Sequence, residues 1–158
     1  MKTITKTEKE TIDFGKKLAK TLKGGDVLLF YGELGAGKTA MTKGIAEGLG
    51  IKNKITSPTF ALMNVYKNTS IQMVSRERKK NPPKTNSPLT KIKKFVHIDT
   101  YRLKDEGELI EIGVEDYLGA PDTVCVVEWP EKLSELLKNK KIKKIKIEHQ
   151  DNGRVIIV

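Results

Sequence analysis

The sequence predicts an α/β protein with an open, mainly parallel sheet, and three observations support this prediction. A buried-looking strand at 27–31 leads through a glycine-rich loop into a helix pattern that starts near Lys38. Two later apolar runs, 95–99 and 124–127, have the length and composition of buried strands. At the end of the chain, two alternating segments flank Asp151-Asn152-Gly153, which predicts an antiparallel hairpin.

The composition excludes several classes of protein. A chain of 158 residues has the length of one domain and can bury a core without disulfides or a structural metal. Its single cysteine, Cys125, lies in an apolar run and has no cysteine to pair with, which fits a reducing cytoplasm. The N-terminus lacks an apolar signal segment, and no stretch is long enough to cross a bilayer. We therefore expect a soluble, cytoplasmic protein with no membrane association.

The net charge of +10 is concentrated in one segment. Residues 67–94 hold nine lysines and arginines against one acid, a net +8, so the rest of the chain carries only +2. Asn81-Pro82-Pro83 and Asn86-Ser87-Pro88 are turn or extended signals, and the segment offers little apolar material to pack. We expect a mobile basic loop or protruding hairpin that attracts an acidic partner.

The first part of the chain predicts two helices around the first strand. A capping box of Thr7 and Glu10 starts a helix over about 8–22, which Gly24-Gly25 ends. Its apolar positions recur at four-residue steps: Phe14, Leu18 and Leu22. The helix after the glycine-rich loop has the same spacing and stops at Gly50. Its apolar positions are Met41, Ile45 and Leu49.

The remaining elements alternate in the same way. Thr56 to Phe60 reads as a loop, and 61–66 resumes a strand pattern. Two short helical pieces are predicted at 108–112 and 114–118, and a further helix, with Leu133, Leu136 and Leu137 on one face, is predicted after the strand at 124–127. The closing hairpin, 141–148 with 154–158, is expected at a sheet edge, where its lysines protect the edge. An RNA or protein contact by these lysines is the less favoured alternative.

Residues 32–39 carry the motif that gives the chain its chemistry. They read Gly-Glu-Leu-Gly-Ala-Gly-Lys-Thr, a spacing in which Gly35 and Gly37 let the loop turn its N–H groups toward a phosphate chain. Lys38 would reach the β- and γ-phosphates, and the Thr39 hydroxyl would bind the accompanying Mg²⁺. A glycine turn followed by a surface lysine is the plain alternative. The strand before the motif and the helix after it favour phosphate binding.

Two acids are expected to share this site. Asp99 and Glu128 each close an apolar strand, and ligands of open parallel sheets bind beyond the carboxyl ends of the strands. Such carboxylates can hold Mg²⁺ and orient a hydrolytic water. Without the phosphate loop they would read as surface acids. We interpret His97 as a packed or hydrogen-bonded strand histidine rather than a ligand, and Trp129 as equally suited to core packing or to a partner contact.

Four motifs in this order resemble the TsaE family, the small bacterial ATPases of tRNA threonylcarbamoyladenosine synthesis. They are Gly32 to Thr39, Thr56-Ser-Pro-Thr-Phe60, His97-Ile-Asp-Thr-Tyr-Arg-Leu103 and Val127-Glu-Trp-Pro130. The resemblance covers nearly the whole chain outside 67–94, where family members have a much shorter turn.

The resemblance implies both a fold and an activity. The implied fold is a three-layer P-loop NTPase fold whose mainly parallel central sheet has antiparallel additions, among them the C-terminal hairpin. The whole chain, 1–158, would be one such domain with a basic insertion at about 67–94. The implied activity is Mg²⁺-dependent ATP hydrolysis, weak alone and dependent on TsaB and TsaD homologues. The tRNA would be reached indirectly or through that complex.

The family pattern also implies residue roles. Lys38, Asp99 and Glu128 would be catalytic, and Thr39, Glu128 and Asp99 would serve the metal. ATP or ADP would be held by Gly35, Ala36, Gly37, Lys38, Thr39 and Ala40, with further contacts from Lys9, Glu131 and Arg154. Ser57-Pro58-Thr59 would form a switch-like loop near the γ-phosphate.

Two other functions remain open at this point. A free-standing P-loop kinase of nucleotides or small molecules would share the phosphate loop, but it needs a lid, and the one long candidate lid has few apolar residues. A basic RNA-binding module would explain the charge instead. Salt-dependent tRNA binding by the isolated chain would distinguish the RNA-binding module from the ATPase.

Overall fold

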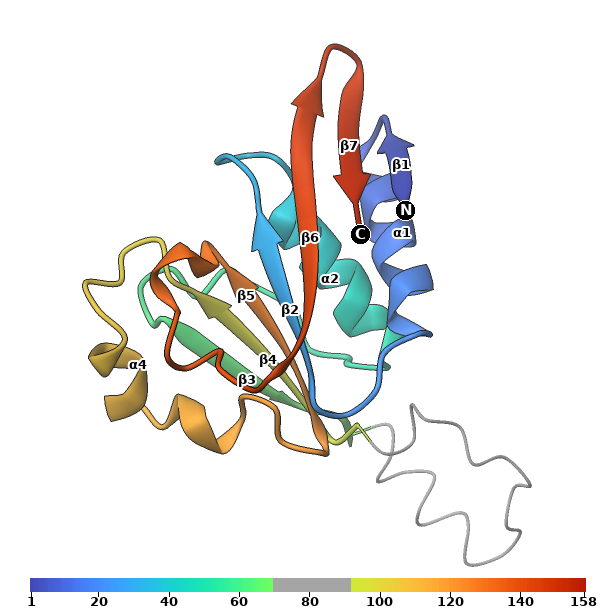
Figure 1. Ribbon diagram of the computed structural model, residues 1–158. Coiled ribbons are helices and arrows are strands. Elements are labelled where there is room, and N and C mark those ends of the chain that lie inside the picture. Colours follow the sequence, from blue (N-terminus) through green and yellow to red (C-terminus); the bar gives the residue numbers. More distant parts are fainter. Residues whose placement is uncertain (70–91) are drawn as a thin grey trace, which may run out of the picture.

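A seven-stranded sheet organises residues 1–69 and 92–158, which are the residues that the computed structural model describes (Figure 1). The order of the strands across the sheet is β1-β7-β6-β2-β5-β4-β3. The strands are β1 (Lys2–Thr5), β2 (Asp26–Tyr31), β3 (Met63–Lys67), β4 (Lys94–Asp99), β5 (Thr123–Glu128), β6 (Lys141–Gln150) and β7 (Gly153–Ile157). The helices are α1 (Glu8–Ala19), α2 (Lys38–Gly48) and α4 (Gly107–Glu111), with short 3₁₀ turns η2 (Val114–Asp116) and η3 (Pro130–Lys132).

The centre of the sheet is parallel and its two sides are antiparallel. Strands β6, β2, β5 and β4 run parallel to their neighbours in this group. On one side, β7 pairs antiparallel with β6 and β1 with β7, and on the other side β3 pairs antiparallel with β4. This arrangement confirms the predicted parallel centre with antiparallel additions.

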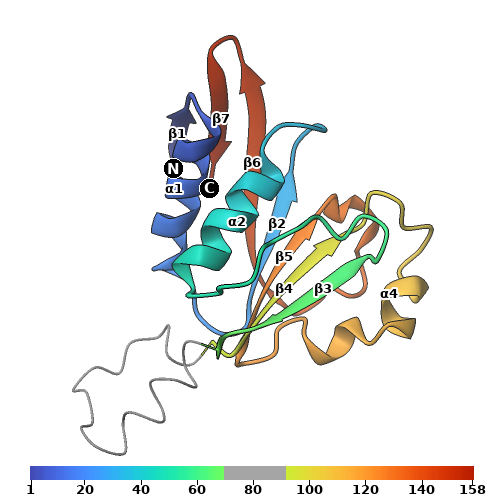
Figure 2. The same cartoon turned by 180° about the vertical axis from the view of Figure 1, so that it is seen from behind.

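Each face of the sheet has its own apolar core. Helices α1 and α2 cover one face (Figure 2), where β2 contributes Leu28 and Phe30 to a fully buried cluster with Met41 and Ile45 of α2. On the opposite face, Leu29 and its neighbours pack under Leu109 of α4 and the segments that follow. The alternation of side chains along β2 therefore serves two cores, which is why its sequence reads as a continuous apolar run.

The N-terminal part of the chain differs from the prediction in two places. Strand β1 was not anticipated, because four residues with one buried side chain give little periodic signal. Helix α1 ends at Ala19, three residues earlier than the apolar spacing predicts, although Leu22 is still fully buried. The predicted N-cap is confirmed, since the Thr7 hydroxyl accepts from the Glu10 N–H at 3.1 Å. The Glu10 carboxylate accepts from the Lys6 N–H at 2.8 Å, one residue before the Thr7 N–H that a capping box would bind.

The helix predicted after the strand at 124–127 is wrong. A short 3₁₀ turn, η3, is followed by non-helical turns, although Leu133, Leu136 and Leu137 are buried as expected. The N–H groups of residues 134–136 donate to the carboxylate of Glu106. A side chain from another part of the chain thus satisfies the donors at the start of this segment, and apolar spacing carries no information about such a partner.

The prediction that the closing hairpin lies at a sheet edge is also wrong. Strand β6 is an inner strand, since it pairs with β2 as well as β7, and β1 forms the edge beyond β7. Edge protection therefore does not explain its lysines. Lys141 instead makes an ion pair with the buried carboxylate of Asp26 on β2, with Nζ and Oδ1 2.6 Å apart.

The basic segment is anchored more firmly at its ends than the sequence suggests. Lys67 and Lys94 are strand residues that face each other in the β3–β4 pair, and Ile92 is fully buried in the core. The buried Asn68 donates to the carbonyls of Leu49 and Ile92. The expectation of a mobile basic loop concerns residues that, at 70–91, lie outside the described part of the chain. Within the described part, no helix is long and apolar enough to cross a membrane.

Candidate functional site

A cleft of about 550 Å³ lies at the carboxyl ends of β2, β4 and β5, beside the start of α2. The predicted site residues that line it are Gly35, Gly37, Lys38, Thr39, Ala40, Asp99, Glu128 and Arg154. Three others do not line it: Ala36 of the loop is buried, and Lys9 on α1 and Glu131 on η3 are exposed. The fold therefore brings most of the predicted residues together from four separate parts of the chain.

The glycine-rich loop has the backbone shape that the motif requires. Gly35 and Gly37 have φ angles of 77° and 107°, in the left-handed region where a side chain is strained. Gly37 caps α2, whose first turn presents unpaired N–H groups and the positive end of the helix dipole to the cleft. A Cβ on Gly32 would lie 2.2 Å from the Ile147 carbonyl oxygen, so the loop is packed closely against β6.

Lys38 is buried rather than extended into solvent. Its amine donates to the carbonyls of Gly32 and Glu33 at 2.6 and 2.9 Å and lies 3.8 Å from the centre of the Trp129 ring. Burial lowers the pKa of this amine from its usual value, against the opposing attraction of Glu128 and other nearby acids. Trp129 therefore contacts the motif lysine itself. This contact is neither of the two roles that the sequence left open, core packing and a partner contact.

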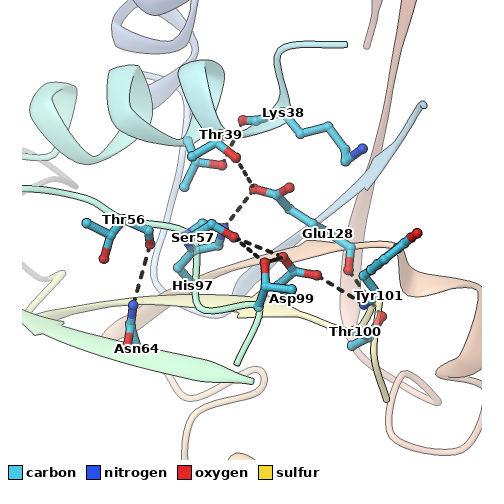
Figure 3. Close-up of polar contacts among 12 residues, drawn as sticks. Lys38, Thr39, Thr56, Ser57, Asn64, His97, Asp99, Thr100, Tyr101 and Glu128 are labelled. Carbon is cyan, nitrogen blue, oxygen red and sulfur yellow. Dashed lines mark hydrogen bonds and ion pairs between the residues drawn. The ribbon is translucent and has the colours of Figure 1, made fainter. Parts of the chain in front are cut away.

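Glu128 contacts the motif directly (Figure 3). The Thr39 hydroxyl donates to its Oε1 at 3.2 Å, and the Nε2 atom of His97 lies 2.8 Å from the same oxygen. The side chain is only 3% exposed, yet it lines the cleft. The predicted hydrogen-bonded role of His97 is confirmed, and its partner is the central acid of the site.

Asp99 organises the loop at 56–60. Its Oδ2 accepts hydrogen bonds from the hydroxyls of Ser57 and Thr59 at 3.0 and 2.6 Å, and its Oδ1 accepts from the Tyr101 N–H at 3.0 Å (Figure 3). The Ser-Pro-Thr loop is thus fastened to the sheet through this one carboxylate. Since both oxygens already accept hydrogen bonds from protein groups, Asp99 is less available than Glu128 to a ligand.

Strand register explains why the two acids meet. Asp99 and Glu128 are directly opposite each other in the parallel β4–β5 pair, and both point to the α2 face. His97 is two residues before Asp99 and therefore lies on the same face. The spacing His-x-Asp at a strand end was the signal that could have placed His97 beside Glu128.

Arg154 completes the polar lining from the β6–β7 hairpin. Its Nε is buried and, among the described residues, has no hydrogen-bond partner. The guanidinium is close to the loop, because a Cβ on Gly37 would be 2.9 Å from Nε. A buried cationic donor without an acceptor, next to a helix N-terminus, is suited to an anion.

Comparisons with known proteins show which family this chain resembles. Residues 5–156 match the family described as "Threonylcarbamoyl adenosine biosynthesis protein TsaE". The chain is 37% identical over 132 residues to the tRNA threonylcarbamoyladenosine biosynthesis protein TsaE of Streptomyces coelicolor, covering 81% of this chain and 73% of that one. It is 34% identical over 142 residues to the protein of the same name from Bacillus subtilis, covering 90% and 74%.

A solved structure gives the same result for the fold. The crystal structure of Bacillus subtilis YdiB superposes with a TM-score of 0.64 at 29% identity, covering 99% of this chain and 82% of that chain. The match therefore extends over nearly the whole of this chain. From its sequence, its fold and the motifs gathered in this cleft, the chain belongs to the TsaE family.

Proposed function

We propose that this protein binds and hydrolyses ATP as a component of the machinery that makes threonylcarbamoyladenosine in tRNA. The observation that carries the proposal is the direct contact between the motif and the strand-end acid: Thr39 at the start of α2 donates to Glu128 at the end of β5. In a P-loop NTPase fold, which we also propose for this chain, these two positions serve the metal that accompanies the nucleotide.

The polar groups of the cleft fit a nucleotide triphosphate chain. The first turn of α2 and the loop at 35–37 offer N–H donors, and Lys38 and Arg154 add two cations. Lys38 is now held by two loop carbonyls, which a phosphate oxygen would replace as acceptor. Phosphate oxygens form stronger, charge-assisted hydrogen bonds with an amine than neutral carbonyls do.

The same cleft fits Mg²⁺. Thr39 and Glu128 supply hydroxyl and carboxylate oxygens, and Asp99 also lines the cleft. Among the described residues, no group of three or more His, Cys, Asp or Glu side chains is placed to hold a metal ion. This sparse set suits Mg²⁺, which keeps several waters and takes its other ligands from phosphates. When bound, the ion would neutralise charge on the phosphates. Glu128 would also orient the attacking water.

Activity is proposed to depend on partner proteins. The family name places relatives in a pathway that modifies tRNA, and we propose TsaB and TsaD homologues as the proteins with which this chain acts. Hydrolysis by the chain alone is expected to be slow. The tRNA would be contacted indirectly or through the assembled complex.

Phosphate release from ATP tests this proposal, measured for the chain alone and with both partner homologues from one organism. We expect slow Mg²⁺-dependent release that rises when both partners are present, and no release by the Lys38→Ala variant. Transfer of the phosphate to a nucleoside or other small acceptor instead of water would contradict the proposal and favour a kinase. Salt-sensitive tRNA binding without any nucleotide turnover would favour an RNA-binding module.

A further inference from the structure

His97 contacts the central acid of the cleft from the interior of the protein. Its side chain is fully buried, and it is not among the residues that line the cleft. Nε2 lies 2.8 Å from Glu128 Oε1 (Figure 3). A residue in this place cannot touch a bound nucleotide, but it can determine where the carboxylate of Glu128 lies.

The strand register makes this contact specific. His97 is opposite Val126 in the β4–β5 pair, so Glu128 is its diagonal neighbour on the α2 face. Side chains at diagonal positions meet only when they are long, and a histidine and a glutamate together span the gap. Thr39, at the start of α2, donates to the same Oε1 at 3.2 Å. The two donors fix one oxygen of the carboxylate.

The second oxygen of Glu128 is left for the cleft. Within the described part of the chain, Oε2 has no hydrogen-bond partner, and it is not among the fully buried polar atoms that lack one. Because the glutamate lines the cleft, the accessible part of its carboxylate is this oxygen. Because the two oxygens belong to one planar carboxylate, holding Oε1 in place also directs Oε2 toward the cleft.

The unpartnered nitrogen of His97 indicates which tautomer makes the contact. Nδ1 is buried and has no hydrogen-bond partner among the described residues. A proton there would be a buried donor without an acceptor, which costs more than an unfilled lone pair. The favoured tautomer carries its proton on Nε2 and donates it to the Glu128 carboxylate.

We propose that His97 is the positioning residue of Glu128: it holds Oε1 from within the core so that Oε2 faces the Mg²⁺ or water of the cleft. The inference rests on the proposed function, because it assigns the support of a group to which that function gives a role. Interactions of this kind, behind a metal-binding group, keep the ligand in one orientation and sustain metal affinity.

Two amide substitutions distinguish positioning from packing. In His97→Gln, the amide nitrogen is the same number of bonds from Cβ as Nε2 of histidine, so it can still donate to Glu128. In His97→Asn, the amide is one bond shorter and occupies the level of Nδ1, out of reach of the carboxylate. Val126→Ala is the matched control, since it removes buried volume next to His97 but leaves the hydrogen bond in place.

Each variant is measured for ADP binding in EDTA, for the gain in ADP affinity on adding Mg²⁺, for ATP hydrolysis and for melting temperature. We expect all variants to bind ADP in EDTA like wild type, because His97 does not line the cleft and Lys38, Arg154 and the loop N–H groups are unchanged. His97→Asn should lose about 10-fold or more of the Mg²⁺-dependent gain and of the hydrolysis rate, and His97→Gln should retain most of both.

Three results would overturn the proposal. Equal losses in His97→Gln and His97→Asn would show that the amide position is immaterial. Equal losses in Val126→Ala would show that packing alone is responsible. Weakened ADP binding in EDTA, in step with the other losses, would indicate a general structural defect. If wild type itself neither binds nor hydrolyses ATP, the proposed function fails, and this result is distinct from a failure of the His97 assignment.

A measurement without nucleotide tests the hydrogen bond directly. The chain has two histidines, His97 and His149, so long-range proton–nitrogen correlation spectra can be assigned with a His97→Gln sample. The expected result is a His97 ring protonated at Nε2 and bare at Nδ1. A ring protonated only at Nδ1 could not donate to Glu128 and would contradict the proposed role.

Discussion

Lys38 holds a buried amine between two backbone carbonyls and an indole ring, which is an unusual place for a charged side chain. Lysines are almost never fully buried unless they are paired, and this one is 4% exposed. The amine is stabilised by two hydrogen bonds, to the carbonyls of Gly32 and Glu33, and by the Trp129 ring. None of these partners carries a full negative charge. The amine can therefore exchange these carbonyl acceptors for the oxygens of a bound anion.

Lys38→Ala should therefore abolish ATP hydrolysis and lower nucleotide affinity without unfolding the protein. The substitution removes the charge but leaves Gly32 and Glu33 carbonyls that water at the cleft can reach. Titration with a fluorescent nucleotide analogue, together with a thermal melt, measures both effects. Unchanged affinity would remove Lys38 from the binding site.

Glu128→Ala should separate binding from hydrolysis. The loop N–H groups, Lys38 and Arg154 remain, so nucleotide should still bind. Hydrolysis should fall by a factor of about 10² or more, because the group that orients Mg²⁺ and the attacking water is lost. A single-turnover assay measures this directly. Hydrolysis at the wild-type rate would transfer the role to Asp99, the next acid in the cleft.

Glycines allow α2, which starts within the motif, to pack closely against α1. A Cβ on Gly44 of α2 would lie 2.0 Å from the Ile12 carbonyl oxygen of α1, and one on Gly15 would lie 2.6 Å from the Met41 carbonyl. Both neighbours are backbone atoms, which cannot move aside as a flexible side chain can. The sequence gives these glycines no special signal, because within a helix they look like weak helix formers.

Gly44→Ala should destabilise the protein by about 1–3 kcal/mol or more, despite the better helix propensity of alanine, because α1 and α2 must move apart. Urea denaturation measures the free energy of unfolding. Gly107→Ala is the matched control: a Cβ there meets only the flexible side chain of Asp105. Equal effects of the two substitutions would mean that close helix packing is not the cause.

Strand β5 provides a second test at the level of the element. Cys125 is fully buried, and burial raises the pKa of its thiol to about 12. The native protein should resist iodoacetamide at pH 8, whereas the denatured chain should react at once. Since only the unfolded thiol ionises between its usual pKa and the raised one, stability should also fall as the pH rises through that interval. Rapid alkylation of the native protein would show that β5 opens locally.

For the molecule as a whole, the basic segment is the feature with the clearest test. Residues 70–91 can be replaced by a short Gly-Asn turn, leaving Asn68 with its contacts to Leu49 and Ile92 and leaving the β3–β4 pairing complete. We expect folding and nucleotide binding to persist, because loop length changes stability only slowly. Association with tRNA or the partner complex should weaken most at low salt, where charges act over the longest distance.

Calorimetry of the shortened protein and binding titrations at two salt concentrations measure these effects. A shortened protein without a cooperative melt would show that 70–91 belongs to the packed domain. A binding loss that does not depend on salt would show that contacts other than charge attraction are responsible.

The sequence by itself determined the local features: the capped first helix, the phosphate-loop motif between a strand and a helix, and the acids at two strand ends. Each is a pattern within about ten residues. Over so short a distance along the chain, the geometry of the backbone fixes where the side chains lie relative to one another. The apolar runs of β2, β4 and β5 and the four-residue apolar spacing of α2 made these elements readable.

Only the tertiary structure decided which residues meet across the chain. It paired His97 with Glu128, laid Trp129 over Lys38, fastened Ser57 and Thr59 to Asp99, and placed β6 inside the sheet rather than at its edge. It also replaced a helix by turns, because Glu106 supplies acceptors from another part of the chain. Strand register and long-range hydrogen bonds set these contacts, and neither leaves a periodic trace in the sequence around any one residue.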